Sequence, residues 1–451
     1  MGTAAAGAVA LGAVAGAAKL IPKAAAAPSM LEPAPAASAA FVQAAGVPAQ
    51  SDVFGNPSPT ILTADVVVCG YGATGIPAAI EAYDAGATNV IVIEKANWLG
   101  GQSRRNAGVL QSASTVVQAA LGVNDSFNEF YAYLLACGQG MADPSLVRSF
   151  ATNDNVDWVI NTLGGQPVSE WSLGTPVVPT NTPDNKLPLT MGPGLSYAWN
   201  DEAHFQEFGC PAIPRAHGFN PNPADAAFWE NPANFCINVL EPGAIVGGTG
   251  VFQTLNNAIA ARPGITVMTS TTLVSLVTGT NGEVLGISAT GADGNPLLIE
   301  AKRGVIIGTG GWSQNESMIE NYLMIPESEI VLGTNPFTVA LPVEEDGAGI
   351  LAAQAIGAAT VFMGGGGGWT TAMQAAGYQV PEVGCGGLKI NADSQVININ
   401  GDPIPRLYAG GRAAGGTLYL IYPAGGCGFG TAMWQGRLAG RNAAALTPWT
   451  S

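Results

Sequence analysis

The hydrophobic pattern of the chain alternates between short apolar runs and stretches with helical spacing. A β-branched run at residues 65–69 predicts a buried parallel strand. Apolar residues at helical spacing follow at 76–86, and a second apolar run at 89–93 predicts the next strand. Strands that alternate with helices in this way are typical of an α/β protein with a parallel sheet.

Similar segments recur further along the chain. Helical spacing predicts helices at 127–139, 143–163 and 247–261. Asn281-Gly282 and Asp293-Gly294 mark two turns between apolar runs. We therefore expect a small antiparallel unit whose strands lie at 265–277, 283–290 and 297–301. Residues 304–312 predict one more buried strand, which ends in glycines.

Two regions do not follow the pattern. Residues 165–245 are interrupted every few positions by Pro, Asn, Trp or Gly, which is typical either of a binding insertion or of surface decoration. Residues 1–59 begin with an alanine-dominated apolar run that resembles the core of an export signal, although the usual basic start is absent. We expect a twin-arginine segment lost upstream and an exported or cell-envelope protein; the alternative is a disordered Ala/Pro tail on a cytoplasmic protein.

Composition narrows the function classes. The chain has 451 residues, 61 of them glycine, only 11% charged residues and a net charge of −16. The excess of acidic residues argues against nucleic acid as a partner. No apolar run is long enough to predict a membrane span. The six cysteines are scattered and the two histidines, His204 and His217, have no paired spacing, so no metal site is predicted.

The first strand is followed at once by a glycine-rich turn. Gly70, Gly72 and Gly75 form a G-x-G-x-x-G pattern that also contains Ala73 and Thr74. Such glycines allow a tight turn, the approach of a pyrophosphate to the backbone and close packing of the next helix. Glu94 ends the second strand about 20 residues on, where an acid can accept a ribose hydroxyl. Strand, turn, helix, strand and acid together predict a dinucleotide-binding site.

Three further motifs resemble the flavoproteins of the fumarate reductase and 3-ketosteroid dehydrogenase superfamily. The first is Glu94-Lys95 followed by Gly100-Gly101-Gln102-Ser103, in a loop that runs to Gly108. The second is the strand that ends in Thr309-Gly310-Gly311. The third lies in residues 386–451 and contains Gly410, Gly411, Arg412 and Gly425. The resemblance implies that these residues bind FAD, and that FAD is favoured over NAD because the N-terminal turn is paired with a C-terminal flavin segment.

The resemblance also implies a domain organisation. We expect a Rossmann-like α/β FAD-binding domain, with a parallel sheet plus a small antiparallel sheet, built from residues 60–335 and 386–451. An abbreviated capping or substrate domain occupies 336–385, and the signal-like segment and linker occupy 1–59. The family's capping domain is much longer, and it supplies the tyrosine that transfers the proton. Tyr197 and Tyr378 lie in suitable regions but match no motif, so this base is unassigned.

The substrate class depends on the segment 422–426, which reads Tyr-Pro-Ala-Gly-Gly. It resembles the Tyr-Pro-Gly-Ala-Gly motif of 3-ketosteroid dehydrogenases, which implies that the Tyr422 hydroxyl and the Gly426 N–H bind a substrate ketone. No histidine follows residue 217, and a doubly anionic substrate would face apolar residues, so fumarate and succinate are disfavoured.

We therefore predict an oxidoreductase that exchanges hydride between FAD and the carbon–carbon bond beside a carbonyl of a small apolar substrate, most simply a 3-ketosteroid. Electrons would be exchanged with a separate protein or a quinone, since the sequence has no haem-attachment motif. The alternatives are a reductase of a small unsaturated acid, with Arg104, Arg105 or Arg412 as the carboxylate clamp, and a non-catalytic flavoprotein subunit.

Overall fold

The computed structural model describes residues 38–46, 58–104, 108–120, 122–138, 140–167, 210, 213, 215–220, 222, 224–226, 247–323, 345–363, 386–417, 423 and 426–450. All of them belong to one compact unit, Ala36–Ser451. Most of the predicted export segment, of the irregular region 165–245 and of the capping region 336–385 lies outside the described residues.

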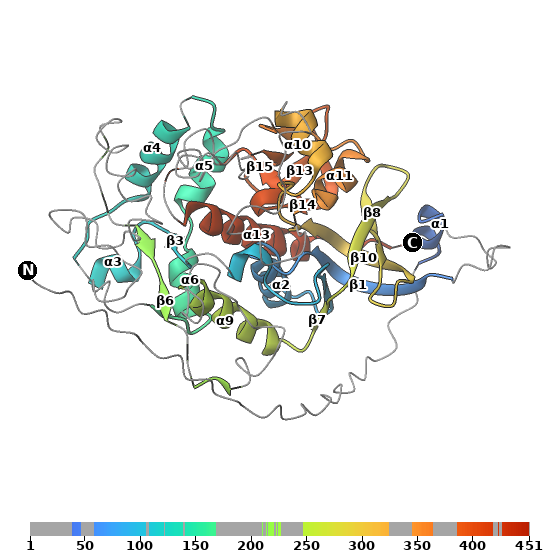
Figure 1. Ribbon diagram of the computed structural model, residues 1–451, viewed down its shortest axis with the longest axis horizontal. Coiled ribbons are helices and arrows are strands. Elements are labelled where there is room, and N and C mark those ends of the chain that lie inside the picture. Colours follow the sequence, from blue (N-terminus) through green and yellow to red (C-terminus); the bar gives the residue numbers. More distant parts are fainter. Residues whose placement is uncertain are drawn as a thin grey trace, which may run out of the picture. The chain divides into compact units, whose positions relative to one another are not determined.

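The helices are distributed along the whole described chain (Figure 1). They are α1 (Ala39–Ala44), α2 (Gly75–Asp84), α3 (Val116–Ala120), α4 (Phe127–Cys137), α5 (Pro144–Ala151), α6 (Asn155–Asn161), α9 (Gly247–Ala260), α10 (Glu316–Leu323), α11 (Ala348–Gln354) and α13 (Cys427–Ala445), with 3-10 turns η1 (Gly101–Arg104) and η4 (Gly411–Ala413).

The strands form one large mixed sheet and smaller ones. The large sheet has the order β13-β14-β10-β1-β2-β7, with β9 paired to β10 and β8 paired to β9. Its members are β1 (Thr60–Cys69), β2 (Val90–Ile93), β7 (Ile265–Met268), β8 (Thr272–Thr278), β9 (Val284–Thr290), β10 (Pro296–Ile307), β13 (Gln395–Ile397) and β14 (Pro403–Ala409). The small sheets contain β3 (Leu110–Gln111), β4 (Gln166–Pro167), β5 (Ala216–His217), β6 (Phe219–Asn220), β11 (Thr360–Val361), β12 (Gly387–Lys389) and β15 (Ala414–Gly415).

The central strands are buried on both faces, as their continuous apolar runs require. Along β1, Val66 and Val68 face a core shared with α2, α9 and α13. Val67 and Cys69 face the opposite core, which α10 and α11 cover. The parallel register of β1 with β2 and β10 brings the carboxyl ends of these strands to the same edge. The predicted α/β class is thus confirmed, and the edge where ligands bind in such sheets is defined.

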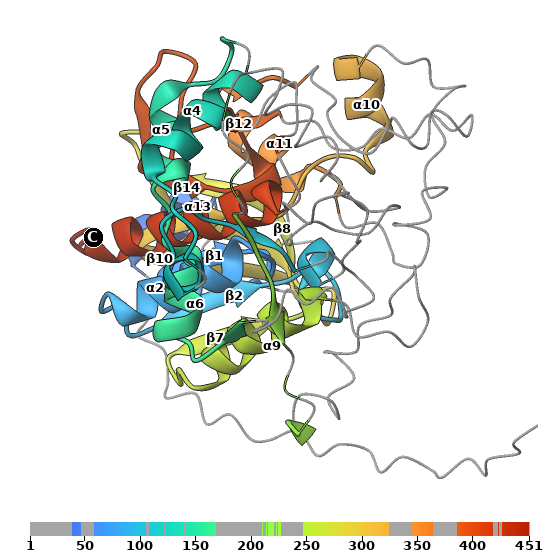
Figure 2. The same cartoon turned by 90° about the vertical axis from the view of Figure 1, so that its left-hand side faces the viewer.

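Helices α2 and α13 come from opposite ends of the chain but pack side by side (Figures 1 and 2). Glycines allow this close approach: a Cβ on Gly436 would lie 2.2 Å from the Thr74 carbonyl oxygen, and one on Gly440 would lie 2.2 Å from that of Ala78. The four-residue spacing puts both glycines on one face of α13. The C-terminal segment is thereby joined to the start of the domain.

Four predicted elements were wrong in their extent. The helix expected at 143–163 is broken between α5 and α6, because the buried Asn153 side chain donates to the Phe150 carbonyl and accepts from the Asn155 N–H. The strand expected at 265–277 is two strands separated by Ser270, whose φ is 52°. β7 joins the parallel sheet and only β8 joins the antiparallel unit.

The strands expected at 297–301 and 304–312 are one long strand, β10. Its first half pairs with β9 in antiparallel fashion, and the whole strand pairs with β1 in parallel. The antiparallel unit is therefore continuous with the main sheet. In addition, part of the predicted linker is packed on the domain: Phe41 of α1 is fully buried, and Ser38 donates its hydroxyl to Glu300 at 2.6 Å.

Candidate cofactor and substrate site

The glycine-rich turn joins β1 to α2 with almost no free space. Gly70 has a φ of 105°, which favours glycine, and its N–H donates to the Ile93 carbonyl at 2.7 Å. A Cβ on Gly75 would lie 1.8 Å from the Gly70 carbonyl oxygen. At Gly72, in contrast, the nearest atom to a Cβ would be the Ser103 Oγ at 3.2 Å. The first and third glycines therefore close the turn, and the second leaves its outer face open.

Glu94 fixes this turn from the end of β2. Its carboxylate accepts from the Tyr71 N–H at 2.9 Å and from the Ala96 N–H at 2.8 Å. Burial raises the pKa of Glu94, and the backbone donors act in the opposite direction. The neighbouring Lys95 forms an ion pair with Asp346 at 3.0 Å. Glu94 thus holds the turn in shape, besides its predicted role toward a ribose.

The loop after β2 returns to the same turn. The Gly100 N–H donates to the Tyr71 carbonyl at 3.0 Å, and the Ser103 Oγ accepts from the Ala73 N–H at 2.6 Å. Gly101 begins η1, and Gly108 precedes β3 with a φ of 69°. The backbone of Gln102 is described as part of η1, whereas its side chain lies outside the description.

Thr74 is the point where three distant segments meet. A Cβ on Gly308, at the end of β10, would lie 3.1 Å from the Thr74 Cβ. One on Gly410 would lie 2.8 Å from the Thr74 Cγ2, and one on Gly411 would lie 2.5 Å from its Oγ1. The N-terminal turn, the returning strand and the C-terminal segment therefore form one site, although more than 300 residues separate Thr74 from Gly410.

The returning strand leads to a polar cluster beside this point. Gly310 and Gly311 follow Thr309; a Cβ on Gly310 would lie 3.4 Å from the Glu345 side chain, and one on Gly311 would lie 3.5 Å from the Arg412 Nε. Glu345 is buried; it pairs with Arg412 at 2.8 Å and accepts from the Ser313 hydroxyl at 2.7 Å. Within the described residues, the buried Thr309 Oγ1 and Arg412 Nε have no hydrogen-bond partner. Two buried polar atoms with unmet hydrogen bonds are a feature of a ligand site.

The C-terminal segment is held by a residue that the sequence reading missed. Gln435 accepts from the Gly411 N–H at 2.8 Å and donates to the Thr417 Oγ1 at 2.9 Å. Glu345 was missed in the same way. The acidic run that ends at Asp346 was a signal for Glu345, but nothing in the local sequence marks Gln435, because its partner lies 24 residues away.

Within the predicted carbonyl-binding segment 422–426, only Pro423 and Gly426 are described. Tyr422 and Gly425 lie outside the described residues, as do Tyr197, Tyr378 and Tyr419. Pro423 is buried, and its carbonyl accepts from the Tyr133 hydroxyl at 2.5 Å. Gly426 is the N-cap of α13, with a φ of 96°, and a Cβ there would lie 2.7 Å from the Val109 carbonyl oxygen.

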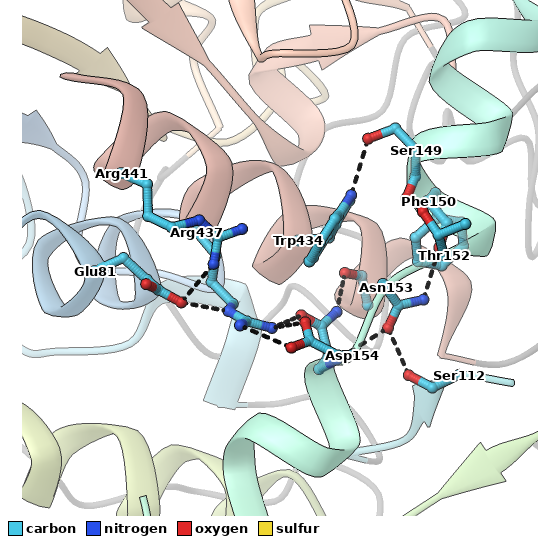
Figure 3. Close-up of polar contacts among 12 residues, drawn as sticks. Glu81, Ser112, Ser149, Phe150, Thr152, Asn153, Asp154, Trp434, Arg437 and Arg441 are labelled. Atoms are coloured by element: carbon cyan, nitrogen blue, oxygen red, sulfur yellow. Dashed lines mark hydrogen bonds and ion pairs between the residues drawn. The ribbon is translucent and has the colours of Figure 1, made fainter. Parts of the chain in front are cut away.

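An ion-pair cluster connects α13 with α2 and α6 (Figure 3). The Arg437 side chain, 3% exposed, contacts Glu81 of α2 at 2.7 Å and Asp154 at the start of α6 at 2.6 Å. Its guanidinium also lies 4.4 Å from the centre of the Trp158 ring. Arg441, one turn later, contacts the same Glu81 oxygen at 3.0 Å. The cluster joins the middle of α13 to the second half of α2 and to the start of α6.

These residues fit a flavin dinucleotide. The turn at Gly72 would lose its open face if a Cβ were present. The amides at the start of α2 favour phosphate. Thr309 and Arg412 have unmet hydrogen bonds. Among the described residues, no group of three or more His, Cys, Asp or Glu side chains could hold a metal ion. No helix in the same residues is long and apolar enough to cross a membrane.

Comparison with known proteins agrees with this geometry. The family model of the FAD binding domain matches residues 65–363, and the chain belongs to this family. FAD is therefore its cofactor. The matched region runs from the middle of β1 beyond the Glu345 cluster and through β11.

Curated relatives are flavoprotein reductases and dehydrogenases. The chain is 26% identical to the NADH:fumarate oxidoreductase of Klebsiella pneumoniae (strain 342), over 66% of this chain and 25% of that protein. It is 25% identical to the fumarate reductase (cytochrome) of Shewanella frigidimarina, over 85% of this chain and 77% of that protein. It is 28% identical to the 3-oxosteroid 1-dehydrogenase of Mycolicibacterium smegmatis, over 66% of this chain and 54% of that protein. The chain thus spans a quarter to three quarters of their lengths.

A solved structure shares the fold. The 3-ketosteroid-Δ4-(5α)-dehydrogenase of Rhodococcus jostii, solved with 4-androstene-3,17-dione, aligns with a TM-score of 0.63. The alignment covers 85% of this chain and 97% of that one at 21% identity. The chain has the FAD-binding fold shared by steroid dehydrogenases and fumarate reductases.

Proposed function

We propose that this protein is an FAD-dependent oxidoreductase that acts on the carbon–carbon bond next to a carbonyl of an apolar substrate, and that the substrate is a 3-ketosteroid. When bound, FAD supplies the two-electron chemistry, accepting or giving hydride at N5. Thr74, Gly72, Ser103, Glu94 and Arg412 would hold the cofactor. The observation that carries the proposal is the geometry of Gly426 at the start of α13.

The backbone geometry of Gly426 supports the proposal that its N–H donates to a substrate. Its left-handed backbone and its contact with Val109 exclude a side chain, so only backbone is present there. Among the described residues, none accepts a hydrogen bond from the Gly426 N–H. It also caps a 19-residue helix, whose N-terminal end favours negative charge.

The chemistry follows from two donors on one ketone. The Gly426 N–H and the Tyr422 hydroxyl would share the developing negative charge of an enolate, which acidifies the neighbouring carbon or polarises an enone for reduction. Such a charge is held best by donors that are fixed before the reaction begins.

An apolar ketone suits the charge distribution better than a dicarboxylate. Of the three arginines considered as carboxylate clamps, Arg412 is engaged by Glu345 at 2.8 Å. The side chains of Arg104 and Arg105 lie outside the described residues. Transfer of an anion into an apolar site costs several kcal/mol unless a cation pairs with it.

A second candidate is the reduction of a small unsaturated acid. It is favoured by the extent of the match to the Shewanella fumarate reductase, which covers 85% of this chain. In either case we propose that electrons are exchanged with a separate protein or a quinone, as the name of that relative, fumarate reductase (cytochrome), indicates for that protein. A location in the cell envelope is proposed from the signal-like N-terminus alone.

The test compares two tyrosine variants of the FAD-loaded protein. Tyr422→Phe removes the proposed donor, and Tyr419→Phe is the matched control from the same segment. With 4-androstene-3,17-dione, loss of one donor is expected to lower kcat by about 100-fold or more. The control should stay within about threefold. Equal effects of the two variants would refute the proposed role of Tyr422.

A further inference from the structure

We propose that Tyr133 is a positioning residue that holds Pro423, three residues before Gly426, and that it thereby sets the direction of the Gly426 N–H. Its importance for catalysis rests on the proposed function. The Tyr133 hydroxyl donates to the Pro423 carbonyl at 2.5 Å across 290 residues of sequence. Both residues are buried, and the tyrosine is only 2% exposed.

The hydrogen bond matters because proline has no N–H. The carbonyl is the only polar backbone group that Pro423 carries, and burial of an unpaired carbonyl is unfavourable. Gly426 lies close to Val109, whose carbonyl oxygen and Cγ1 are each 2.7 Å from where a Cβ on Gly426 would lie. Tyr133 thus contacts Pro423, and Val109 lies close to Gly426.

Tyr133 itself is attached to a rigid platform. Phe130, one turn earlier on α4, packs edge to face against Phe150 of α5 with ring centres 5.6 Å apart. Phe150 also lies against Gly430 in α13. Tyr133 belongs to the same buried cluster as Cys427, the first residue of α13.

Hydrogen bonds fix this platform to the first turns of α13. The Trp434 Nε1 donates to the Ser149 hydroxyl at 3.0 Å, as Figure 3 shows. The Asn155 side chain donates to the Gly430 carbonyl at 2.8 Å. The hydroxyl of Tyr133 and the N–H of Gly426 are therefore held in the same frame, so a shift of Pro423, three residues before Gly426, would misdirect the donor.

Tyr133→Phe removes this hydrogen bond and keeps the ring. We expect kcat with 4-androstene-3,17-dione to fall about five- to tenfold, because loss of a net hydrogen bond corresponds to that factor. KM should change by less than about twofold, since the donor matters most in the transition state. Hydrogen exchange of the peptide that contains Gly426 should be faster in the variant, a readout that needs no substrate.

Tyr131→Phe is the matched control. Tyr131 lies on the same helix, but its ring packs under Arg148, 3.9 Å from the guanidinium carbon. The control should leave both exchange and kcat as in the wild type. Unchanged exchange in Tyr133→Phe, unchanged kcat despite faster exchange, or equal effects of the two variants would each overturn the proposal. If the wild type does not turn over the steroid but Tyr133→Phe still exchanges faster, the positioning contact is supported and the proposed substrate is refuted.

Discussion

The junction between α2 and α13 should depend on Arg437. Its guanidinium forms two short ion pairs in a site where the side chain is 3% exposed, with Glu81 at 2.7 Å and Asp154 at 2.6 Å. Replacement by methionine keeps the apolar stem and removes both contacts. Hydrogen bonds to charged groups contribute roughly 1.5–3 kcal/mol each.

The two contacts do not count equally in Arg437→Met. The Asp154 side chain is 57% exposed and regains water, so its loss costs little. The Glu81 side chain is 12% exposed and keeps Arg441 as a partner at 3.0 Å, which moderates the loss of Arg437. We therefore expect the free energy of unfolding to fall by about 2–4 kcal/mol, below the upper range for an unpaired buried charge.

Arg441→Met is the matched control, because Arg441 contacts the same Glu81 oxygen from a side chain that is 35% exposed. Exposed pairs contribute about 0–1 kcal/mol. Chemical unfolding of the FAD-loaded proteins, followed by flavin fluorescence and circular dichroism, measures both variants. If Arg437→Met unfolds at the wild-type denaturant concentration, or if the two variants lose equal stability, the cluster does not hold the two helices together.

Three further outcomes are expected. Gly75→Ala should destabilise the fold by about 1–3 kcal/mol, because its Cβ would lie 1.8 Å from the Gly70 carbonyl oxygen. Gly72→Ala should fold normally but bind FAD at least about tenfold more weakly, which a flavin fluorescence titration would measure. Equal folding defects in the two variants would contradict this prediction. Burial lowers the pKa of His217 from 6.5 to about 4, so between these pH values the unfolded chain binds a proton that the folded chain does not. The free energy of unfolding should therefore fall by up to about 3 kcal/mol as the pH is lowered from 6.5 to 4. His217→Gln should flatten this pH dependence, and an equally steep dependence in the variant would refute the prediction. Burial raises the pKa of the Cys69 thiol to about 12, so iodoacetamide at pH 8 should modify Cys69 only after unfolding, as peptide mass spectrometry would show.

Local sequence signals were sufficient for the parts of the site that lie close together in the chain. The run 65–69, the three glycines after it and Glu94 are within 30 residues of one another, and each has a conformational or chemical requirement that its residue type reveals. The family resemblance added FAD and the C-terminal segment. The site assignments of individual residues stay predictions.

Contacts over long sequence distances were not visible in the same way. Arg437 reads as an ordinary polar residue of a helix, yet it joins Glu81, 356 residues away. The break between α5 and α6 depends on Asn153, whose side chain also donates to the Gln111 carbonyl, 42 residues away. Helical spacing continues through this break, so periodicity alone could not locate it. Tertiary hydrogen bonds decided these features.

The most direct test of the central claim is an anaerobic titration of the FAD-loaded protein, in both redox states, with 4-androstene-3,17-dione and separately with fumarate. Our account predicts that the steroid either bleaches the oxidised flavin or reoxidises the reduced flavin, and that fumarate does neither. Reoxidation by fumarate with no response to the steroid in either redox state would contradict it.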